Sequence, residues 1–357
     1  MSQWRFPAEW ERQSAILLAW PHEGTDWAER LAGVEDTYVA LIVAITRFQH
    51  VVVCVADADL QTYAEARLRS ARVNMDRVRF VEVDYDDTWL RDSGPITLSS
   101  FPSPRLLREN VPKADEEGAF RLLDFQFTGW GGKFEASLDN LLIEALVEKK
   151  LFLNFNRQAI DFALEGGAIE TDGEGTLLTT WRCLHERHPE ASQSDLSTLL
   201  AGWLAQDRVL WLQHGYLEGD DTDAHIDTLA RLAPGDAIVF QSCDDPADSH
   251  FAELQKMAEE IAALRTRAGQ PYRLFPLPWP QPIVDGERRL AASYANFLIV
   301  NGAVLMPAYD DRADDAAAAV LAQAFPDREI VPVPCRALIW QNGSLHCVTM
   351  QLPEGLV

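Results

Sequence analysis

Two short polar motifs contain the residues of this sequence that are best suited to catalysis. Cys347 lies in His346-Cys347, a few residues after an Asn-Gly dipeptide, and His225 and Asp227 form a His-x-Asp motif. A thiolate is a strong nucleophile, and a histidine can transfer protons near neutral pH. A cysteine in an apolar run is more often a small buried hydrophobe, which is our interpretation of Cys54 in VVVCV. The presence of a His-x-Asp motif elsewhere in the sequence makes Cys347 a candidate nucleophile.

A carboxylate close to an aromatic ring indicates a planar cation as ligand. Asp92 follows Trp89 by three residues in DDTWLRDSGP. A guanidinium can donate two parallel hydrogen bonds to a carboxylate while its flat face stacks on a ring. The alternative is that Arg91 pairs with a nearby acid and Trp89 belongs to the core. Glu165 precedes two glycines, as at many binding sites and many plain turns.

The two residues of the His-x-Asp motif have several possible roles. In a strand, His225 and Asp227 would point to the same face, as an acid/base histidine and a substrate-holding carboxylate require. A surface ion pair is an equally good interpretation of the motif alone. A divalent metal is a third, with ligands from His225, Asp227, Asp220, Asp221 and Glu165. The sequence contains no HExxH motif, so we predict no metal.

The net charge of the chain argues against polyanionic partners. Its 31 Lys and Arg residues against 55 Asp and Glu residues give a charge of −24, which repels nucleic acid and anionic membrane surfaces. A solvated acidic surface explains this charge most simply, although a cationic substrate would also fit it. We expect no nucleic acid and no membrane as partner.

Cysteine usage and the start of the sequence indicate a reducing compartment. The five cysteines are an odd number without a CxxC pair, which argues against a disulfide framework or a thiolate zinc site. The first residues, MSQWRFPAEW, lack the basic flank and apolar stretch of a secretion signal. No apolar run reaches the length of a membrane span. A cytoplasmic location and the absence of a cofactor are the default expectations.

Apolar periodicity predicts an alternation of helices and strands. Residues that recur at three and four positions predict helices at 26–48, 58–71, 136–150, 195–205, 246–269 and 313–324. Short β-prone runs predict strands at Ala15–Trp20, Val51–Val55, Val78–Val83, Leu122–Phe127, Val209–Leu212 and Phe297–Met306.

Glycine turn signals add hairpins to this alternation. They occur at Asp172-Gly173, Asn301-Gly302 and Asn342-Gly343. A recurring strand-strand-helix-strand unit explains helices and hairpins together, and 357 residues would hold about five units of roughly 70 residues. No linker divides the chain, and Pro102–Glu117 is predicted to be a surface loop. We expect one catalytic domain over residues 1–357.

Seven segments in a fixed order give the candidate residues a common context. They are WPHEGTDW, DDTWLRDSGP, GWGGKF, LEGGAIETDGEGTLLTT, TDAHIDTLARL, ANFLIVNGAVLMPAYDD and NGSLHCVTMQLP. This order closely resembles the agmatine deiminase and bacterial peptidylarginine deiminase family, from about Trp20 to Gln351. The specificity of the match lies in WLRDSGP, LEGG, HID and HC together.

The resemblance implies a fold and a site. The fold would be the pentein α/β-propeller, with five pseudo-symmetric strand-strand-helix-strand units around a central polar channel. The implied catalytic residues are a nucleophile, an acid/base, two carboxylates that clamp the guanidinium and a supporting carboxylate: in this order Cys347, His225, Asp92 with Asp227, and Glu165. Trp89 would line the substrate channel, and Asn296 would be a neighbour of the site.

The implied chemistry is hydrolysis of a guanidinium group. Its central carbon is a poor electrophile, so Asp92 and Asp227 would position it near the thiolate of Cys347. His225 would protonate the departing ammonia, and would later take a proton from the water that breaks an S-alkylthiouronium intermediate. Nearby carboxylates raise the pKa of a thiol. We therefore expect the free enzyme to hold Cys347 as the thiol and the bound cation to complete the nucleophile.

The far end of the substrate decides between members of this family. Agmatine carries a second cation, which the acids Asp220, Asp221 and Asp223 would favour, and we take Asp221 as a substrate-binding residue. A peptide with C-terminal arginine carries a carboxylate instead and would favour a cation. The loop after Asp92 offers three: Arg105, Arg108 and Lys113.

Two departures from typical agmatine deiminases bear on substrate identity rather than on the chemistry. Typical members resemble Gly-Gly-Gly-Asn-Ile-His-Cys at the nucleophile, where this chain reads Asn342-Gly343-Ser344-Leu345-His346-Cys347. In addition, Asp223-Ala224 replaces an expected Asn-Gly.

We expect hydrolysis of agmatine to N-carbamoylputrescine and ammonia, in putrescine synthesis. Three alternatives stay open: peptidylarginine deimination, a catalytically silent guanidine-binding module on the same scaffold, and metal-dependent hydrolysis. Dimers are common among similar proteins, so a homodimer is a further expectation.

Overall fold

Five small sheets make up most of the β-structure. The protein is described by a computed structural model, which places residues 4–100 and 119–357. The five sheets within these residues, each with its strands in their order across that sheet, are β4 (Ile96–Ser99), β5 (Phe120–Gln126), β6 (Phe155–Ala163); β7 (Ile169–Thr171), β8 (Thr176–Thr180), β9 (Arg208–Leu212); β10 (Ala230–Ala233), β11 (Ala237–Gln241), β12 (Arg273–Leu277); β15 (Leu298–Val300), β16 (Ala303–Ala308), β17 (Glu329–Pro334); and β18 (Met350–Pro353), β1 (Gln13–Ala19), β2 (His50–Val55), β3 (Val78–Glu82). A separate ribbon pairs β13 (Val284–Asp285) with β14 (Arg288–Arg289).

All five sheets share one connectivity. The first two strands in the order given are antiparallel, and the second and third are parallel. Parallel neighbours need a long crossover, which a helix usually supplies. The helices between the parallel strands are α1 (Leu31–Thr46), α4 (Gly129–Gly132) with α5 (Leu142–Glu148), α6 (Trp181–Arg187) with α7 (Gln193–Trp203), α8 (Phe251–Ala263) and α9 (Asp314–Ala324). The predicted strand-strand-helix-strand unit is confirmed in all five sheets.

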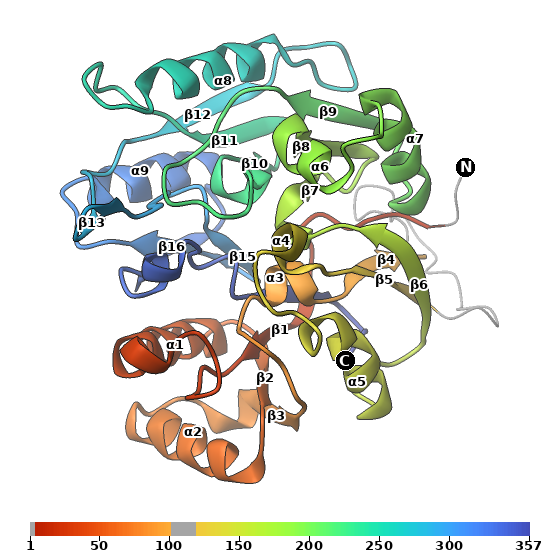
Figure 1. The fold of residues 1–357 in the computed structure, drawn as a ribbon, viewed down its shortest axis with the longest axis vertical. Coiled ribbons are helices and arrows are strands. Elements are labelled where there is room, and N and C mark those ends of the chain that lie inside the picture. Colours follow the sequence, from red (N-terminus) through yellow and green to blue (C-terminus); the bar gives the residue numbers. More distant parts are fainter. Residues whose placement is uncertain (1–3, 101–118) are drawn as a thin grey trace.

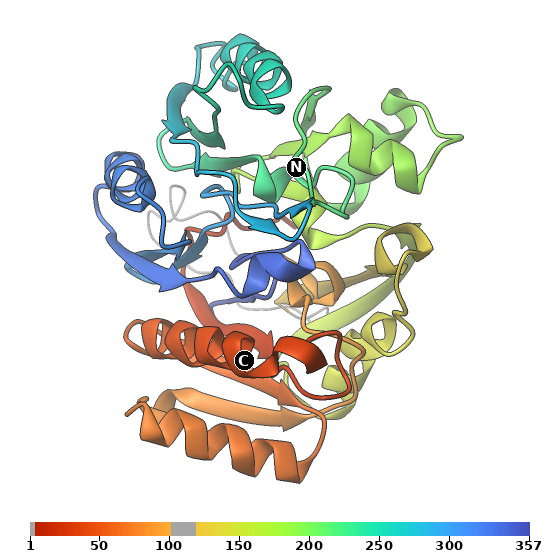
Figure 2. The same ribbon diagram turned by 60° about the vertical axis from the view of Figure 1, so that its left-hand side comes forward.

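The two ends of the described chain meet in one sheet. β18 runs antiparallel to β1, with Met350 opposite Leu17, so the last strand of the chain completes the sheet of the first. α2 (Ala58–Ser70) then leads to the additional strand β3. In Figure 1, α1, α2, α7 and α8 lie at the periphery, whereas α3 (Leu90–Ser93) and β15 lie near the middle. Figure 2 shows the same peripheral helices from another side.

Several strands of the interior are buried along their whole length. Every residue of β8, β10, β11 and β15 is buried, as expected for strands that are covered on both faces. Side-chain caps begin α2 and α7. Asp57 accepts a hydrogen bond from the amide of Leu60 at the start of α2, and Ser192 and Asp195 form a reciprocal capping box at the start of α7.

The helices expected from the sequence are present, but several are shorter. α2, α7 and α9 agree with the predicted bounds within two residues. Prediction of 26–48, 136–150 and 246–269 as single helices was wrong at the ends. The structure begins α1 and α5 with separate 3-10 turns at Ala28–Arg30 and Asp139–Leu141. In the described residues, no helix is both long enough and apolar enough to cross a bilayer.

Two of the three predicted hairpins are confirmed. Asp172-Gly173 lies between the antiparallel strands β7 and β8, and Asn301-Gly302 connects β15 to β16. The hairpin at Asn342-Gly343 was wrong: Leu338–Gln341 is a 3-10 helix, and Asn342 ends it with a φ of 73°. Pro102–Glu117, predicted to be a surface loop, lies outside the described residues.

Candidate active site

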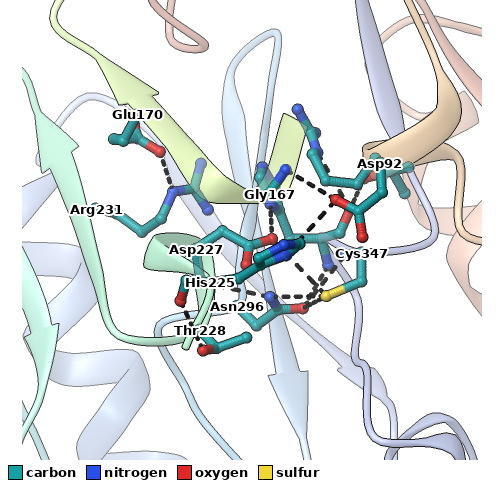
Figure 3. A network of polar contacts seen from close by, with 12 residues as sticks. Asp92, Gly167, Glu170, His225, Asp227, Thr228, Arg231, Asn296 and Cys347 are labelled. Carbon is teal, nitrogen blue, oxygen red and sulfur yellow. Dashed lines mark hydrogen bonds and ion pairs between the residues drawn. The ribbon is translucent and has the colours of Figure 1, made fainter. Parts of the chain in front are cut away.

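The predicted site residues occupy equivalent places in the five units. Each lies two to five residues ahead of the first strand of its sheet: Asp92 before β4, Glu165 before β7, His225 and Asp227 before β10, Asn296 before β15 and Cys347 before β18. The repeated connectivity therefore brings together residues that are up to 255 positions apart in sequence. Figure 3 shows most of them converging in the interior.

An open cavity of about 540 Å³ gives access to part of this cluster. Cys347 and Asp92 lie on its wall, together with the predicted substrate-binding residues Trp89 and Asp221. The acidic side chains of the wall are Asp26, Asp86, Asp87, Asp92, Glu135, Asp139 and Asp221. Arg288 is the basic side chain among its described lining residues, and it already bonds to the Asn342 side chain. The field inside the cavity therefore favours a cation.

Cys347 is a buried thiol between polar groups. Its Sγ lies 3.2 Å from Asn296 Nδ2 and 3.8 Å from Asp227 Oδ2. Burial, and then the negative charges of Asp227 and Asp92, raise the pKa of Cys347 well above its ordinary value. This agrees with the expectation that the ligand-free protein holds the thiol. Cys347 lies in a turn at 345–348 that leads into β18, not in a strand.

Asp92 is fixed by two donors, Gly167 from the next unit and Trp130 from its own unit. The backbone amide of Gly167 donates to Oδ1 at 2.9 Å, and Trp130 Nε1 donates to Oδ2 at 2.9 Å. A Cβ at Gly167 would lie 2.5 Å from His225 Nδ1 and 2.8 Å from Asp92 Oδ1, so only glycine fits there. Burial raises the pKa of Asp92 to about 6 although the nearby His225 lowers it.

His225 lies between two carboxylates and is fully buried. Its Nδ1 is 3.7 Å from Asp92 Oδ1, and its Nε2 is 3.6 Å from Glu165 Oε2. Burial alone would lower its pKa, but Asp92, Cys183 and Glu165 raise the pKa of His225 well above its ordinary value. The prediction that His225 and Asp227 share a strand was wrong, because His225 precedes a 3-10 turn at Ile226–Thr228. A histidine poised to carry a proton is nevertheless at the site.

Glu165 is an ionised carboxylate on the far side of His225. Arg187 Nε donates to its Oε1 at 2.7 Å. Burial would raise its pKa, but His225 and Arg187 lower the pKa of Glu165 below its ordinary value. Glu165, Cys183 and His225 also bring one possible metal-ligand atom each within 4.8 Å of one another. Because Arg187 already neutralises Glu165, the cluster fits a carboxylate that supports His225 better than a metal centre.

Asp227 keeps one oxygen free. His346 Nδ1 lies 2.7 Å from Oδ2, whereas Oδ1 is buried without a hydrogen-bond partner. Burial would raise its pKa, but His346 lowers the pKa of Asp227 below its ordinary value. Asn296 packs beside it, donating to the backbone carbonyl of Asp227 at 3.3 Å. An unpaired buried carboxylate oxygen is a strong acceptor for a cationic ligand.

Of the three acids predicted to receive a second cation, Asp221 alone faces the cavity. Asp220 accepts hydrogen bonds from the amides of Thr222 and Ala224, and Asp223 pairs with Lys133 and Arg187. The suggestion that Asp220 and Asp223 assist a substrate was therefore wrong, since neither lines the cavity. Asp221 Oδ2 also has a local donor, Asn342 Nδ2, but Asp221 faces the cavity. Arg105, Arg108 and Lys113, considered for the opposite preference, lie outside the described residues.

The turn before His225 explains one departure from the family pattern. Asp223 and Ala224, which stand where the resemblance leads us to expect Asn-Gly, both have positive φ, 66° and 72°. The left-handed region costs an L-residue with a Cβ about 1–2 kcal/mol. Asp220 and Thr180 hold the turn, because Asp220 Oδ2 accepts from the amide of Ala224 and Thr180 Oγ1 donates to its carbonyl.

Replacing Ala224 by glycine is expected to raise the free energy of unfolding by about 0.5–1 kcal/mol, since relief of the strained φ outweighs the added freedom of the unfolded chain. Urea denaturation measures this difference. Ala319→Gly in the interior of α9 is the matched control and should lower stability by about 1 kcal/mol. Equal losses in both variants would contradict the strain at Ala224.

Several residues at the site had no predicted role. Trp130 and His346 occur in the motifs GWGGKF and HC, and only the structure shows what they contact. Arg187 lies in α6, a seven-residue helix too short for a clear apolar period. Glu9 contacts His346 from the segment before β1, and no motif marked it. A buried acid in a short N-terminal segment leaves no pattern in one sequence.

Comparison with known proteins shows the family of the chain. The sequence profile of the Porphyromonas-type peptidyl-arginine deiminase family matches residues 5–353. The chain belongs to this family. An agmatine deiminase from Pseudomonas aeruginosa strain LESB58 is 34% identical over 376 residues, covering 98% of this chain and 95% of the relative.

Solved structures of family members superpose along the whole chain. A substrate-bound C. jejuni agmatine deiminase, in which a cysteine is replaced by serine, is 33% identical with a TM-score of 0.86, covering 99% of this chain and 97% of the other. A provisionally named arginine deiminase from Porphyromonas gingivalis is 42% identical with a TM-score of 0.86, covering 99% of both chains. The names of these similar proteins therefore refer to more than one guanidine substrate, namely agmatine and arginine.

Proposed function

We propose that this chain hydrolyses agmatine to N-carbamoylputrescine and ammonia through a covalent intermediate on Cys347. The observation that carries the proposal is the arrangement at the base of the acidic cavity. A buried thiol there lies close to Asp227 Oδ2 and in the field of Asp92, and His225 lies within 3.7 Å of Asp92. Two carboxylates, a thiol and a histidine suit displacement at a guanidinium carbon. Relatives named agmatine deiminase support the choice of substrate.

We also propose that the five units are the blades of one pentein propeller, and that residues 1–357 form one catalytic domain. The common connectivity of the sheets supports this, as does the pairing of β18 with β1. The equivalent positions of the site segments, each ahead of a first strand, give further support. A homodimer and a cytoplasmic location stay predictions from the resemblance and from composition.

The first half of the reaction forms the intermediate. Asp92 and the free Oδ1 of Asp227 would bind guanidinium N–H groups and hold the central carbon near the sulfur of Cys347. The cation would offset the two carboxylates that raise the thiol pKa, so binding itself favours the thiolate. Sulfur attacks the carbon, and His225 gives its proton to the departing nitrogen, which leaves as ammonia.

The second half releases the product. Water adds to the carbon of the S-alkylthiouronium, and neutral His225 accepts its proton. The carbon–sulfur bond breaks, the thiol is restored and the ureido product leaves. Glu165 stabilises the protonated form of His225 at Nε2 and is itself held by Arg187. In this account Asn296, whose amide lies 3.2 Å from the sulfur, steadies the thiolate.

The wall of the cavity supports a substrate with a second cation. Burial raises the pKa of Asp87 to about 8 and that of Asp139 to about 7, so these two are partly protonated at neutral pH. Asp221 is a half-buried acid on this wall, and its Oδ2 accepts a hydrogen bond from Asn342 Nδ2. Trp89 forms an apolar face, packed so tightly on Gly343 that a Cβ there would lie 2.2 Å from the ring. An aliphatic linker on Trp89 with an ammonium near Asp221 fits this wall.

The experiment for the proposed function is a substrate panel. Purified protein is incubated separately with agmatine, free arginine and a peptide ending in arginine, and ureido product and ammonia are measured. The proposal expects agmatine to react with the highest kcat/KM. Reaction of the peptide alone would identify a peptidylarginine deiminase, and binding without product from any of the three would indicate a silent module. Addition of a chelator should leave the rate unchanged.

The pH dependence of kcat/KM for agmatine should have two parts. Below about pH 6 it should fall steeply with acid, because Asp92 takes a proton and ceases to hold the cation. Above pH 6 it should still rise into the alkaline range. The active form has lost one proton from the pair Cys347 and His225, and both pKa values lie well above their ordinary values.

By contrast, kcat should vary little between about pH 7 and 9, because bound agmatine has already favoured the thiolate. Initial rates over a range of agmatine concentrations at each pH measure both quantities. A kcat/KM that is flat from pH 5 to 8 would contradict the assigned roles of Asp92 and Cys347.

A further inference from the structure

Behind Asp227, a buried chain of charged groups leads away from the cavity. His346 lies between two carboxylates, with Nδ1 2.7 Å from Asp227 Oδ2 and Nε2 2.7 Å from Glu9 Oε2. Both acids and the imidazole are at most 5% exposed. Burial would raise the pKa values of both acids, but Arg231 and His346 lower that of Glu9, and His346 lowers that of Asp227, below their ordinary values. As ionised carboxylates, both acids only accept hydrogen bonds. Both ring nitrogens of His346 must therefore donate, which makes it an imidazolium.

Glu9 is held rigidly in this position. Arg231 Nη2 lies 2.6 Å from Oε2, and the amide of Ile299 donates to Oε1 at 2.6 Å. Arg231 is fully buried and also bonds to Glu170 at 2.5 Å, as Figure 3 shows on the side of Asp227 away from Cys347. Glu9 comes from the segment before β1, 337 residues away from His346. The tertiary fold thus places one fixed acid on the outer nitrogen of His346.

We propose that Glu9 is a positioning residue for the reaction: by holding His346 as a cation, it keeps Asp227 ionised and its Oδ1 available to the substrate guanidinium. The role rests on the proposed function. If Glu9 were neutral, His346 could keep a single ring proton, and the counter-charge beside Asp227 would be lost. Loss of the positive charge in contact with a buried carboxylate raises its pKa, even where more distant cations such as His225 and Arg231 remain. A protonated Asp227 cannot clamp a cation.

Several charged groups besides Glu9 bear on the protonation state of Asp227. The titratable and charged groups that face it are His346, His225, Arg231, Arg91, Asp92 and Cys347. Around Glu9 they are His346, Arg231, Arg91, Glu170 and Arg328. Arg91 Nη2 is 3.9 Å from Glu9, too far for a hydrogen bond, so it cannot replace the contact between Glu9 and His346.

The test is the ratio of kcat/KM for agmatine between Glu9→Gln and wild type as a function of pH. Glutamine keeps the shape and reach of Glu9 but not its charge. We expect about a tenfold or greater loss at pH 6 that narrows to about threefold or less at pH 9, because Asp227 then ionises without help. The loss should lie mainly in KM, since the clamp binds substrate. A ratio that stays constant with pH would overturn the proposal and indicate general damage to the fold.

Two further variants keep the test decisive. Glu11 lies two residues from Glu9 and pairs with Arg5 instead of His346. The pH profile of Glu11→Gln should therefore match that of wild type. If Glu9→Gln is insoluble, His346→Asn takes its place, because asparagine can donate to Asp227 but carries no charge. Its ratio to wild type should narrow with pH in the same way, and a constant ratio would again overturn the role. If wild type itself fails to turn over agmatine, the proposed function fails, whereas a constant ratio with active wild type refutes only the role of Glu9.

Discussion

Replacing Cys347 by serine is expected to lower kcat for agmatine by about 10⁴-fold or more. Serine fills nearly the same volume, but its hydroxyl stays protonated where a bound cation would convert the thiol into thiolate. The carboxylates that would clamp the guanidinium are unchanged, with Asp92 held by Gly167 and Trp130 and Asp227 held by His346. Agmatine should therefore still bind, with a Kd within about threefold of the wild-type KM. Isothermal titration and rate measurements on the same sample measure both quantities.

The matched control for this variant is Cys54→Ala. Cys54 is buried in β2 within an apolar cluster, and burial raises its pKa to about 12, as for an inert thiol. Its replacement should leave kcat within about twofold of wild type. Residual turnover of more than one per cent in the Cys347 variant, or a comparable loss in the control, would contradict the assignment of the nucleophile.

Replacing His225 by asparagine should lower kcat by about 10²–10⁴-fold. Asparagine preserves polar contacts in the pocket between Asp92 and Glu165 but cannot exchange a proton. Without a proton donor, the departing nitrogen would leave as an amide anion, and the water in the second step would lack a base. Both halves of the reaction should slow, and a higher pH should not restore turnover, because it does not supply the missing proton donor.

The control for His225 is His214→Asn. His214 is partly exposed and pairs with Glu253 at 3.0 Å, away from the residues that line the cavity. It should retain wild-type kcat and pH dependence. A loss below tenfold in the His225 variant would mean that water or Glu165 supplies the proton instead.

The fold was predictable where one segment carries its own signal. α2, α7 and α9 have a clear apolar period, and the hairpin at Asn301-Gly302 follows from its turn residues. The edge strands β6 and β17 were missed for physical reasons. β6 has only two buried residues, Ile160 and Phe162, among exposed and half-buried ones. β17 carries two prolines, which are tolerated at a sheet edge because the lost donor faces no partner.

The sequence was sufficient to predict which residues gather at the candidate site, but not which contacts they make there. The predicted catalytic residues lie together because each precedes the first strand of its unit: Cys347, His225, Asp92, Asp227 and Glu165. The predicted local structure was wrong for His225 and for the turn at Asn342, since 3-10 helices of three or four residues are too short to show an apolar periodicity. Of the three acids in the segment before His225, Asp221 faces the cavity whereas Asp220 and Asp223 do not, which only tertiary packing decides.

The central claim is that the guanidinium carbon becomes covalently attached to Cys347. The direct measurement mixes enzyme with excess agmatine, quenches with acid during the first turnovers, digests the protein and maps the peptides by mass spectrometry. The account predicts an adduct with the mass of agmatine minus ammonia on the peptide that contains Cys347, present in wild type and absent from the serine variant. Steady formation of ureido product with no adduct on Cys347 under any quench time, or an adduct on another cysteine, would contradict it.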